Sequence, residues 1–344
     1  MLIKRSKIPV FEMVMIGFLP SFLKKMIYRL KGYKIGKGVH IGLGSIIIGE
    51  EVSIGDYSKV GFITVIRARK ICLERFVIIG SMTMIDTEEV IIGEDTRINE
   101  NVIIGGIRTP ESSIRIGKRA IVMEYSCLNP TKPIVIGNDS GIGGHCLLFT
   151  HGSWLNQLDG FPVTFAPITI GNNVWLPWRV FIMPGVTIGN EVVIGANSLI
   201  SSNLPSNVMA AGSPAKIWKE NYPPKLSEEK RLAILDLIFS EFQTYLEHNH
   251  ITVKKNDIED GLCFFVQKKK QTFCLVFLKT RPPIKNTLPP QIDLLILHQG
   301  FENFELGATM TLNIEKKTRK GTSLLGEEFV KYVSRHGIRF ERMD

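Results

Sequence analysis

Two histidines, His145 and His151, lie where a six-residue repeat breaks off after Leu148, before it resumes at Ile170. An imidazole titrates near pH 6.5, so either ring could take or give a proton at neutral pH. His151 stands at the root of the excursion, which favours a general base. The alternative is a polar residue that only begins a loop. His145 occupies the equivalent place in the preceding repeat, so we expect it on a different side of the structure, in a structural or surface role. The alternative is that it lines the same cleft as His151.

The repeat that carries these histidines extends over much of the chain. Aliphatic residues recur every six positions, often followed by Gly, which is typical of a parallel β-helix whose short strands stack on one another. Grouped in threes, with one residue for each side of a three-sided coil, they predict eight coils. The triplets are 35/41/47, 54/60/66, 73/79/85, 92/98/104, 116/122/128, 136/142/148, 170/176/182 and 188/194/200.

Two joints between coils carry insertions. Successive triplets begin 18 to 20 residues apart except at two places, where the spacing is 24 and 34. The shorter insertion lies around Gly106 to Ser113, and the longer one runs from His151 to about Pro167. Because insertions in a repeat array form surface loops that often bind ligands, we expect the site near them.

Length and composition allow a second domain beside the repeat. The chain has 344 residues and a hydrophobic content of 44%, enough for more than one core. We predict a helical N-terminal cap over 1–34, a β-helix over 35–221 and a C-terminal α+β domain over 222–344.

The positive charge of the chain is concentrated at its N-terminus. Residues 1–40 hold nine lysine and arginine residues against Glu12, so this segment carries eight of the nine surplus charges. An apolar run from Ile8 to Leu23 is interrupted by Glu12 and by Pro20, which argues against a transmembrane helix. A signal peptide is not expected, because no small-residue cleavage pattern follows and the β-helix begins almost at once. We favour a helical cap on the first coil. A basic amphipathic anchor at an anionic lipid surface remains the alternative.

The cysteines indicate a reducing compartment. There are five of them, without a CxxC motif, so reduced thiols in a cytoplasmic protein are the simpler interpretation. We expect a cytoplasmic location, with a peripheral position at the inner face of the membrane left open.

The C-terminal residues predict a small α+β domain. Tyr222-Pro223-Pro224 marks a linker, and Ser227 is placed to cap a helix. The domain has no cluster of catalytic residue types, so we expect it to bind, to cap an oligomer or to select a substrate. The expected elements are a helix with an apolar stripe at Leu232, Leu235, Phe239, Phe242 and Leu246, strands at Leu262–Val266, Phe273–Phe277, Ile292–Leu297 and Thr309–Ile314, a hairpin tip at Lys268-Lys269-Lys270, and a helix from Ser323 to His336.

Two stretches, PITIGNNVWLPWRVFIMPGVTIGNEVVIGANSLI and LPSNVMAAGSPAK, resemble the hexapeptide-repeat acyltransferases. The resemblance is to the sugar O-acetyltransferase branch, near galactoside and maltose acetyltransferases. It covers roughly Ile35 to Lys219 and is most specific from Phe149 to Lys216. It implies a mainly β fold built on a left-handed parallel β-helix, a homotrimer with active sites between neighbouring prisms, and acetyl-CoA as the donor.

The same resemblance implies roles on the acceptor side. His151 stands at the position of the family's catalytic histidine, at the same offset before the PITIGNNVW run. The polar residue that contacts the acceptor in the family falls within 123–126, where the usual Asn is missing. Glu124 is the candidate there for positioning the acceptor or the imidazole, and a solvated glutamate is the alternative. Asp159, contributed by a neighbouring subunit, is a second candidate.

On the donor side the sequence departs from the family pattern. Val174-Trp175-Leu176-Pro177-Trp178 stands where the family has VWIGS, and Ser201-Ser202 stands where a Thr-Lys pair is common. The tryptophans could stack along pantetheine or adenine, or Trp178 could pack at a trimer seam. Lys216 and Lys219 could bind CoA phosphates. The candidate donor-binding residues are Trp175, Trp178, Ala196, Ser201, Lys216 and Lys219.

The leading hypothesis is an acetyl-CoA-dependent acetyltransferase acting on a sugar, either a nucleotide sugar or a surface-polysaccharide unit. No metal and no nucleic-acid partner are expected. The rival is a zinc enzyme of the carbonic-anhydrase kind, which needs three histidines at a subunit interface, and the β-helix has only His40, His145 and His151. A scaffold without catalysis is the third possibility. The sequence leaves open whether an oxygen or a nitrogen is acylated.

Overall fold

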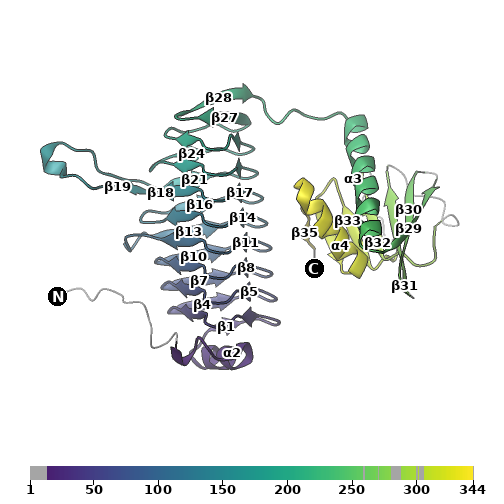
Figure 1. Cartoon of the computed structure of the whole chain (residues 1–344), viewed down its shortest axis with the longest axis horizontal. Coiled ribbons are helices and arrows are strands. Elements are labelled where there is room, and N and C mark those ends of the chain that lie inside the picture. The colour runs from purple at the N-terminus through teal and green to yellow at the C-terminus, as the bar shows by residue number, and fades with distance from the viewer. Residues whose placement is uncertain are drawn as a thin grey trace. The chain divides into compact units, whose positions relative to one another are not determined.

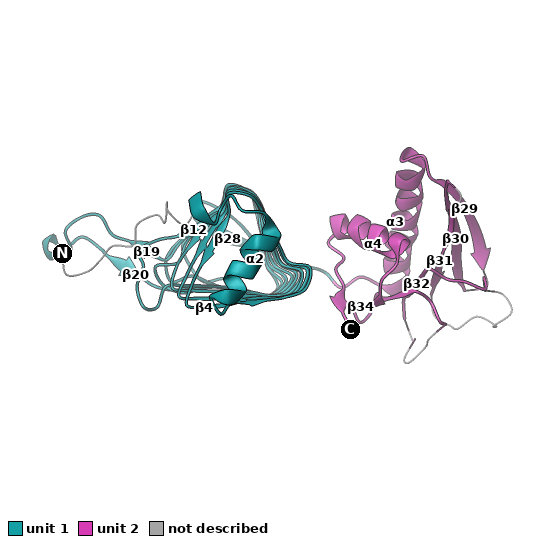
Figure 2. Ribbon diagram, turned by 90° about the horizontal axis from the view of Figure 1, so that it is seen from below, with its two compact units in different colours: residues 1–224 teal, residues 225–344 magenta. Residues whose placement is uncertain are grey.

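The computed structural model of the chain describes residues 14–258, 260–269, 271–279, 288–299, 301 and 306–343. The chain divides into two compact units, Met1–Pro224 and Lys225–Asp344 (Figure 2). Predictions that concern residues 1–13, among them the first charges of the N-terminal segment and Glu12, lie outside the described residues.

The first unit is a left-handed parallel β-helix, as expected (Figure 1). The chain passes in turn through three sheets, called here sheets 1, 2 and 3, and eight coils result. Sheet 1 holds β1 (Lys34–Ile35), β4 (Glu51–Ile54), β7 (Lys70–Leu73), β10 (Glu89–Ile92), β13 (Ser113–Ile116), β16 (Ile134–Ile136), β21 (Ile168–Ile170) and β24 (Thr187–Ile188). Sheet 2 holds β2 (His40–Ile41), β5 (Lys59–Val60), β8 (Ile78–Ile79), β11 (Arg97–Ile98), β14 (Ile121–Val122), β17 (Gly141–Ile142), β22 (Trp175–Leu176), β25 (Val193–Ile194), β27 (Val208–Gly212) and β28 (Ala215–Glu220). Sheet 3 holds β3 (Ile46–Ile48), β6 (Val65–Arg67), β9 (Met84–Asp86), β12 (Ile103–Gly105), β15 (Cys127–Asn129), β18 (Leu147–Phe149), β23 (Phe181–Ile182) and β26 (Leu199–Ile200).

The core of the coil confirms the predicted triplets. Every aliphatic residue of the eight triplets is buried in one continuous cluster, and even Ile35 in the first coil is only 9% exposed. Successive strands of a sheet pair in parallel and in register, so that Ile98 lies beside Val122, and Val122 beside Ile142. The six-residue period therefore sets the fold, because it delivers one inward side chain to each side of each coil.

Helix α2 (Ser21–Leu30) closes the N-terminal end of the coil. Tyr28 is only 1% exposed and stacks on Tyr33, which precedes β1. In the described part of the N-terminal segment, a helix therefore covers the end of the first coil. Among the described residues, no helix combines the length and the apolar character needed to span a membrane.

Both predicted insertions leave the coil where sheet 3 passes to sheet 1. The shorter one connects β12 to β13, and the longer one connects β18 to β21. The longer insertion forms an arm that projects from the coil (Figure 1). The arm contains β19 (His151–Gly152), the 3₁₀ turn η1 (Gln157–Asp159) and β20 (Thr164–Phe165), and β19 pairs antiparallel with β20.

The second unit is one sheet in the strand order β29 to β35, with α3 and α4 packed on one face. The Ser227 side chain caps α3 as predicted, by accepting a hydrogen bond from the Lys230 amide. Strands β29, β34 and β35 were not predicted. The reason is clearest in β29, an edge strand of sequence TVKKNDI that lacks an apolar run. The elements are α3 (Glu228–His248), β29 (Thr252–Ile258), β30 (Gly261–Lys268), β31 (Gln271–Leu278), β32 (Leu294–Leu297), β33 (Met310–Asn313), β34 (Thr318–Gly321), α4 (Leu324–Val333), η3 (Ser334–His336) and β35 (Glu341–Arg342).

All five cysteines are free thiols in the structure. Cys263 and Cys274 come nearest to each other, with their Sγ atoms 3.7 Å apart. This distance is well beyond the roughly 2.05 Å of a disulfide bond.

Candidate active site

His151 has a hydrogen-bonding partner one coil below it. Nδ1 of the imidazole lies 3.3 Å from Oγ1 of Thr131, at the turn between sheets 3 and 1. Thr131 is fully buried, whereas His151 is half-buried, so the ring is held on one side and open on the other. Thr131 was not predicted as a site residue. The spacing could have found it, because these two coils begin 20 residues apart and position 131 therefore lies directly under position 151.

The other hydrogen bonds of Thr131 assign the protonation of the imidazole. Its hydroxyl donates to Oδ1 of Asn129 at 2.8 Å and accepts from the backbone N–H of Ile107 at 3.0 Å. Since a hydroxyl has a single hydrogen, the contact with His151 must then use a proton on Nδ1. In the neutral ring, this pattern leaves Nε2 without a proton and able to accept one, which is the tautomer that a general base requires.

Both insertions meet at Thr131. Ile107 and Thr109 belong to the shorter one, and the Thr109 hydroxyl donates to the Thr131 carbonyl at 3.0 Å. The longer one begins at His151, whose ring stacks on that of Phe165 with centroids 5.7 Å apart and an interplanar angle of 13°. The imidazole is therefore fixed from below by a hydroxyl and from one side by an aromatic ring. Phe165 was not predicted, because only the pairing of β19 with β20 brings it back to the root of the arm.

Glu124 lies at a different edge of the prism, in the turn from sheet 2 to sheet 3 that follows β14. Nδ2 of Asn99, one coil below, donates to Oε2 of Glu124 at 2.9 Å. This hydrogen bond holds the pKa of the Glu124 carboxyl below its usual value, so the group stays ionised and serves as a hydrogen-bond acceptor. Within one chain the structure does not bring Glu124 to His151, and the partner that orients the imidazole is Thr131.

His145 shares the edge of Glu124, as its place in the repeat predicted. Its ring stacks on Tyr125 with centroids 5.1 Å apart and lies 5.8 Å from the ring of Trp178. The backbone N–H of His145 donates to the Glu124 carbonyl at 3.1 Å. The described contacts of this imidazole are thus those of a ring packed between aromatic neighbours.

The two tryptophans of the donor-side prediction are half-exposed and lie over glycines. Trp175 projects from the outer face of β22, and Trp178 follows it in the next turn. A Cβ atom placed on Gly141 would lie 2.6 Å from the Trp175 indole, and one on Gly144 would lie 2.3 Å from that of Trp178. The glycines one coil below therefore make room for both indoles to lie flat along the coil.

The predicted donor-side residues do not lie near the histidine of their own chain. Trp175, Lys216 and Lys219 all belong to sheet 2, and Ala196 follows a sheet 2 strand at the same turn as Trp178. In a three-sided prism, sheet 2 is opposite to the edge where sheets 3 and 1 meet, which is the edge of His151. Ser201 is the exception, because it follows β26 at the edge of His151, two coils further along.

The arm carries large apolar side chains that are exposed to solvent. Trp154 is 95% exposed and Leu158 is 94% exposed. Asp159, the second acceptor-side candidate, accepts a hydrogen bond from Nδ2 of Asn156 at 2.9 Å and is exposed at the end of η1. The structure therefore places Asp159 away from the His151 of its own chain, and the role predicted for it requires another subunit.

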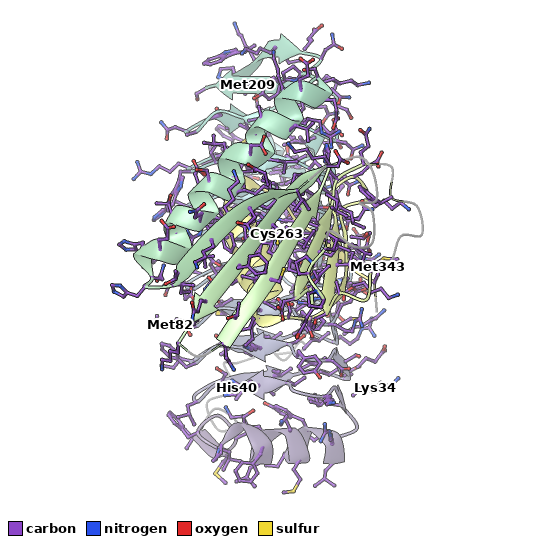
Figure 3. All side chains as sticks on the ribbon, turned by 90° about the vertical axis from the view of Figure 1, so that its right-hand side faces the viewer. Lys34, His40, Met82, Met209, Cys263 and Met343 are labelled. Atoms are coloured by element: carbon purple, nitrogen blue, oxygen red, sulfur yellow. The ribbon has the colours of Figure 1, made fainter. Side chains whose placement is uncertain are left out.

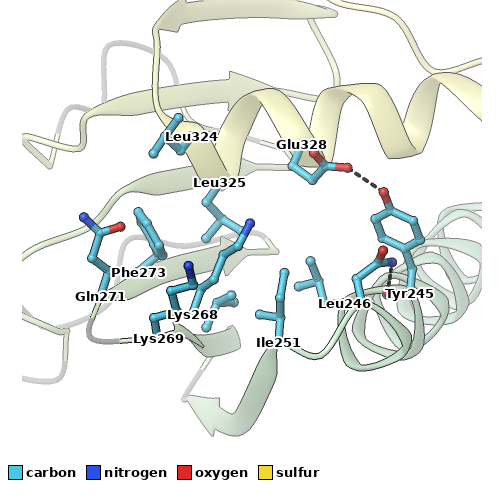
Figure 4. A pocket seen from close by; sticks show the side chains of 12 residues that line it. Tyr245, Leu246, Ile251, Lys268, Lys269, Gln271, Phe273, Leu324, Leu325 and Glu328 are labelled. Carbon is cyan, nitrogen blue, oxygen red and sulfur yellow. Dashed lines mark hydrogen bonds between the residues drawn. The ribbon is translucent and has the colours of Figure 1, made fainter.

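The second unit contains a cavity of about 830 Å³ between α3, the β30–β31 hairpin and the start of α4 (Figure 4). Its wall is mostly apolar, with Leu246, Phe273 and Leu325 among the lining residues, and Lys268 and Lys269 stand at its rim. The hydroxyl of Tyr245 donates to Oε1 of Glu328 at 2.6 Å. This is a plausible size for a small-molecule site.

The profile of the family described as bacterial transferase hexapeptide (six repeats) matches residues 167–202. This stretch, residues 167–202, carries the repeat of the hexapeptide transferases. Among curated proteins, the galactoside O-acetyltransferase of Escherichia coli is 56% identical over 54 residues, which are 16% of this chain and 27% of that protein. The putative lipopolysaccharide biosynthesis O-acetyl transferase WbbJ of the same species is 46% identical over 65 residues, 19% of this chain and 33% of that protein. The chain thus spans about a third of the length of these relatives.

Two solved structures of acetyltransferases are also similar to parts of the chain. The acetyltransferase VCA0836 of Vibrio cholerae is 26% identical, with 38% of this chain and 73% of that chain covered and a TM-score of 0.34. The polySia-specific acetyltransferase NeuO is 22% identical, with 58% of this chain and 86% of that chain covered and a TM-score of 0.42.

Proposed function

We propose that this protein transfers the acetyl group of acetyl-CoA to a sugar, with His151 as the general base. The observation that carries the proposal is the hydrogen bond between His151 and Thr131, because it leaves Nε2 free to accept a proton at a half-open site. The names of the curated relatives, which are O-acetyltransferases of galactoside and of lipopolysaccharide biosynthesis, support a sugar acceptor.

The chemistry assigned to the site is acyl transfer. Nε2 of His151 removes the proton from an acceptor hydroxyl as its oxygen forms a bond with the thioester carbonyl carbon. The tetrahedral intermediate then loses the bond to sulfur, and the imidazolium returns the proton to the departing CoA thiolate. Thr131 keeps Nδ1–H in place and accepts a stronger hydrogen bond once the ring becomes positively charged.

We place the donor on sheet 2 of a neighbouring copy in a homotrimer. Apart from Ser201, the donor-side residues lie on the opposite side of the prism from the base, so a complete site needs two chains. The exposed Trp154 and Leu158 of the arm supply apolar surface for such a contact. In this assembly the indoles of Trp175 and Trp178 stack on the pantetheine or adenine, while Lys216 and Lys219 neutralise CoA phosphates.

Glu124 is assigned to the acceptor rather than to the imidazole. Its carboxylate is ionised and held by Asn99, so it can accept hydrogen bonds from sugar hydroxyls but has no proton to give. In the trimer it would act on the acceptor bound at the His151 of a neighbouring chain. The second unit is assigned to acceptor selection, and its apolar cavity is the candidate surface.

The proposed setting is the cytoplasm, where acetyl-CoA and reduced thiols coexist, and the proposed acceptor is a nucleotide sugar or a surface-polysaccharide unit. Among the described residues, no group of three His, Cys, Asp or Glu side chains is arranged to hold a metal within one chain. The zinc-enzyme alternative therefore rests on histidines from several subunits.

One experiment separates the candidate functions. Purified protein is analysed for zinc and assayed for release of the free CoA thiol with a panel of amino and hydroxyl sugars, free and nucleotide-linked. Acceptor-dependent thiol release without stoichiometric zinc is the expected result. Stoichiometric zinc with carbon dioxide hydration would support the rival, and no activity of either kind with any acceptor would support a scaffold.

A further inference from the structure

Helix α2 has its polar side inward and its apolar side outward. It crosses the end of the β-helix below the first coil (Figures 1 and 2). Lys24 and Tyr28 on the inner side are 0% and 1% exposed. Phe22 and Leu30 are 67% and 82% exposed. A helix that only covers a core has the opposite arrangement.

The inner side is polar because the first coil presents open backbone groups. Nζ of Lys24 donates to the carbonyls of Gly42 and Ser45, the latter at 2.9 Å. The hydroxyl of Tyr28 accepts from the backbone N–H of Ile47 at 2.9 Å. Such groups at the end of a stack of strands have no next coil to pair with, and α2 satisfies them. The need to close the coil therefore explains why the inner side of the helix is polar. It does not explain why the outer side is apolar.

The outer side is a continuous apolar stripe. Phe22, Met26 and Leu30 are spaced by four residues on α2, and their exposed fractions are 67%, 54% and 82%; Phe18, in the turn before the helix, is also 67% exposed. Residues four apart are neighbours on one side of a helix. Figure 3 shows α2 below the first coil, where Lys34 and His40 are labelled, with side chains that point away from the coil. An exposed stripe of this kind marks a surface that meets a partner.

The charge around the stripe identifies the partner. Between Val14 and Gly49 the sequence has six lysine and arginine residues and no aspartate or glutamate. Lys24 is buried, and the other five are exposed or half-buried. Lys25 and Arg29 lie on α2 itself, and Lys31, Lys34 and Lys37 follow it at the start of the first coil. A second copy of this surface would bring like charges together. An anionic bilayer matches both the charge and the apolar side chains.

We propose that the outer side of α2 docks on an anionic lipid bilayer as an interfacial helix. Phe22, Met26 and Leu30 enter the boundary between headgroups and acyl chains, and the lysines lie at the level of the phosphates. Prisms that associate side by side leave this end of the coil free, so a trimer could present three such helices together. The proposal does not depend on the acetyltransferase activity.

The test is flotation of the full-length protein with vesicles of phosphatidylcholine alone and of phosphatidylcholine with phosphatidylglycerol. The expected result is binding to the anionic vesicles only, weakened at high salt because screening shortens the range of the attraction. Phe22→Asp/Met26→Asp should abolish binding. Lys25→Glu/Lys34→Glu should lower the partition coefficient on anionic vesicles by roughly tenfold or more.

The matched control is Leu237→Asp, which changes an apolar residue on α3 that is 58% exposed and should leave binding unchanged. Unaltered thermal unfolding of each variant shows that lost binding is not lost folding. Absence of vesicle binding by the wild type, or binding that survives Phe22→Asp/Met26→Asp, overturns the proposal. So does light scattering in which that double variant reduces the oligomer size without lipid, because the stripe would then be an interface between copies.

Discussion

Oγ1 of Thr131 and Nδ1 of His151 are 3.3 Å apart and come from successive coils of the β-helix. The same hydroxyl also contacts Asn129 and the backbone of Ile107, so its position is set by three neighbours. An imidazole held in this way keeps one tautomer and one orientation. Much of the expected chemistry depends on this pair.

His151→Ala should remove the base. General-base catalysis contributes about 10² to 10⁴ in rate, so kcat for thiol release on the best sugar acceptor should fall by roughly that factor. The KM for acetyl-CoA should change little, because the donor is assigned to sheet 2. Steady-state kinetics with both substrates varied would measure the two effects separately.

His145→Ala is the matched control, since His145 packs between Tyr125 and Trp178 at another edge. It should retain most of kcat. Near-full activity of His151→Ala would mean that the base lies elsewhere, and an inactive His145→Ala would move the active site to the edge between sheets 2 and 3.

Thr131→Val should misplace the imidazole without removing it. We expect kcat to fall by up to about 10²-fold, because a misplaced catalytic group can cost that much. The pH profile of kcat should also change, since Nδ1 loses its acceptor. Thr131→Ser keeps the hydroxyl and should restore both the rate and the profile. If Val and Ser variants were equally impaired, the methyl group and not the hydrogen bond would matter.

Mixing two inactive variants should restore activity if each site takes residues from two chains. His151→Ala lacks the base, and Trp175→Ala/Trp178→Ala lacks the proposed donor surface. After the two are unfolded and refolded together in equal amounts, about one quarter of the sites should by chance combine an intact base with an intact donor surface. The activity of wild-type protein that has been unfolded and refolded in the same way is taken as 100%. No recovery, or a monomer in light scattering, would contradict the shared site.

Removing the chain after Lys219 should leave a folded trimer. The two units have separate cores, and each coil of a repeat array is stabilised by its neighbours. The KM for the sugar acceptor should rise more than the KM for acetyl-CoA. An insoluble truncated protein would show that the second unit is needed for folding, and an equal loss for both substrates would rule out a role in acceptor selection.

The stability of the β-helix should rise with pH between about 8 and 10 because of Lys24. Burial lowers the pKa of Lys24 to about 8, whereas an unfolded lysine titrates near 10.4. In this range the unfolded chain binds more protons than the folded chain, so deprotonation favours folding, by about 2 kcal/mol from pH 8 to pH 10. The free energy of unfolding of the wild type and of Lys24→Met, measured by denaturant unfolding at several pH values, gives this change in stability. A difference between the two proteins that did not vary with pH would contradict the titration of Lys24.

Some features followed from the sequence because they depend on local periodicity. Residues six apart such as Ile136, Ile142 and Leu148 are all buried because each coil contributes one strand to each of its three sides, so the number of coils and the positions of the insertions could be counted. The helix after Ser227 was predictable for the same reason, since its apolar stripe has a helical period. The place of His151 at the root of the arm was a consequence of this counting.

Other features depend on which residues of different coils lie together. Thr131 was not predicted as the partner of His151, and Glu124 was considered for that role although it lies at another edge. Sequence spacing identifies a position within a coil, but the contacts of a side chain come from the coils above and below and from loops that fold back, as Phe165 does. The orientation of α2, with its polar side chains toward the coil and its apolar side chains outward, also depends on tertiary contacts. The composition of the helix only indicated that it is amphipathic. The open backbone groups of the first coil account for the inward position of Lys24 and Tyr28, because these two side chains supply their hydrogen-bonding partners.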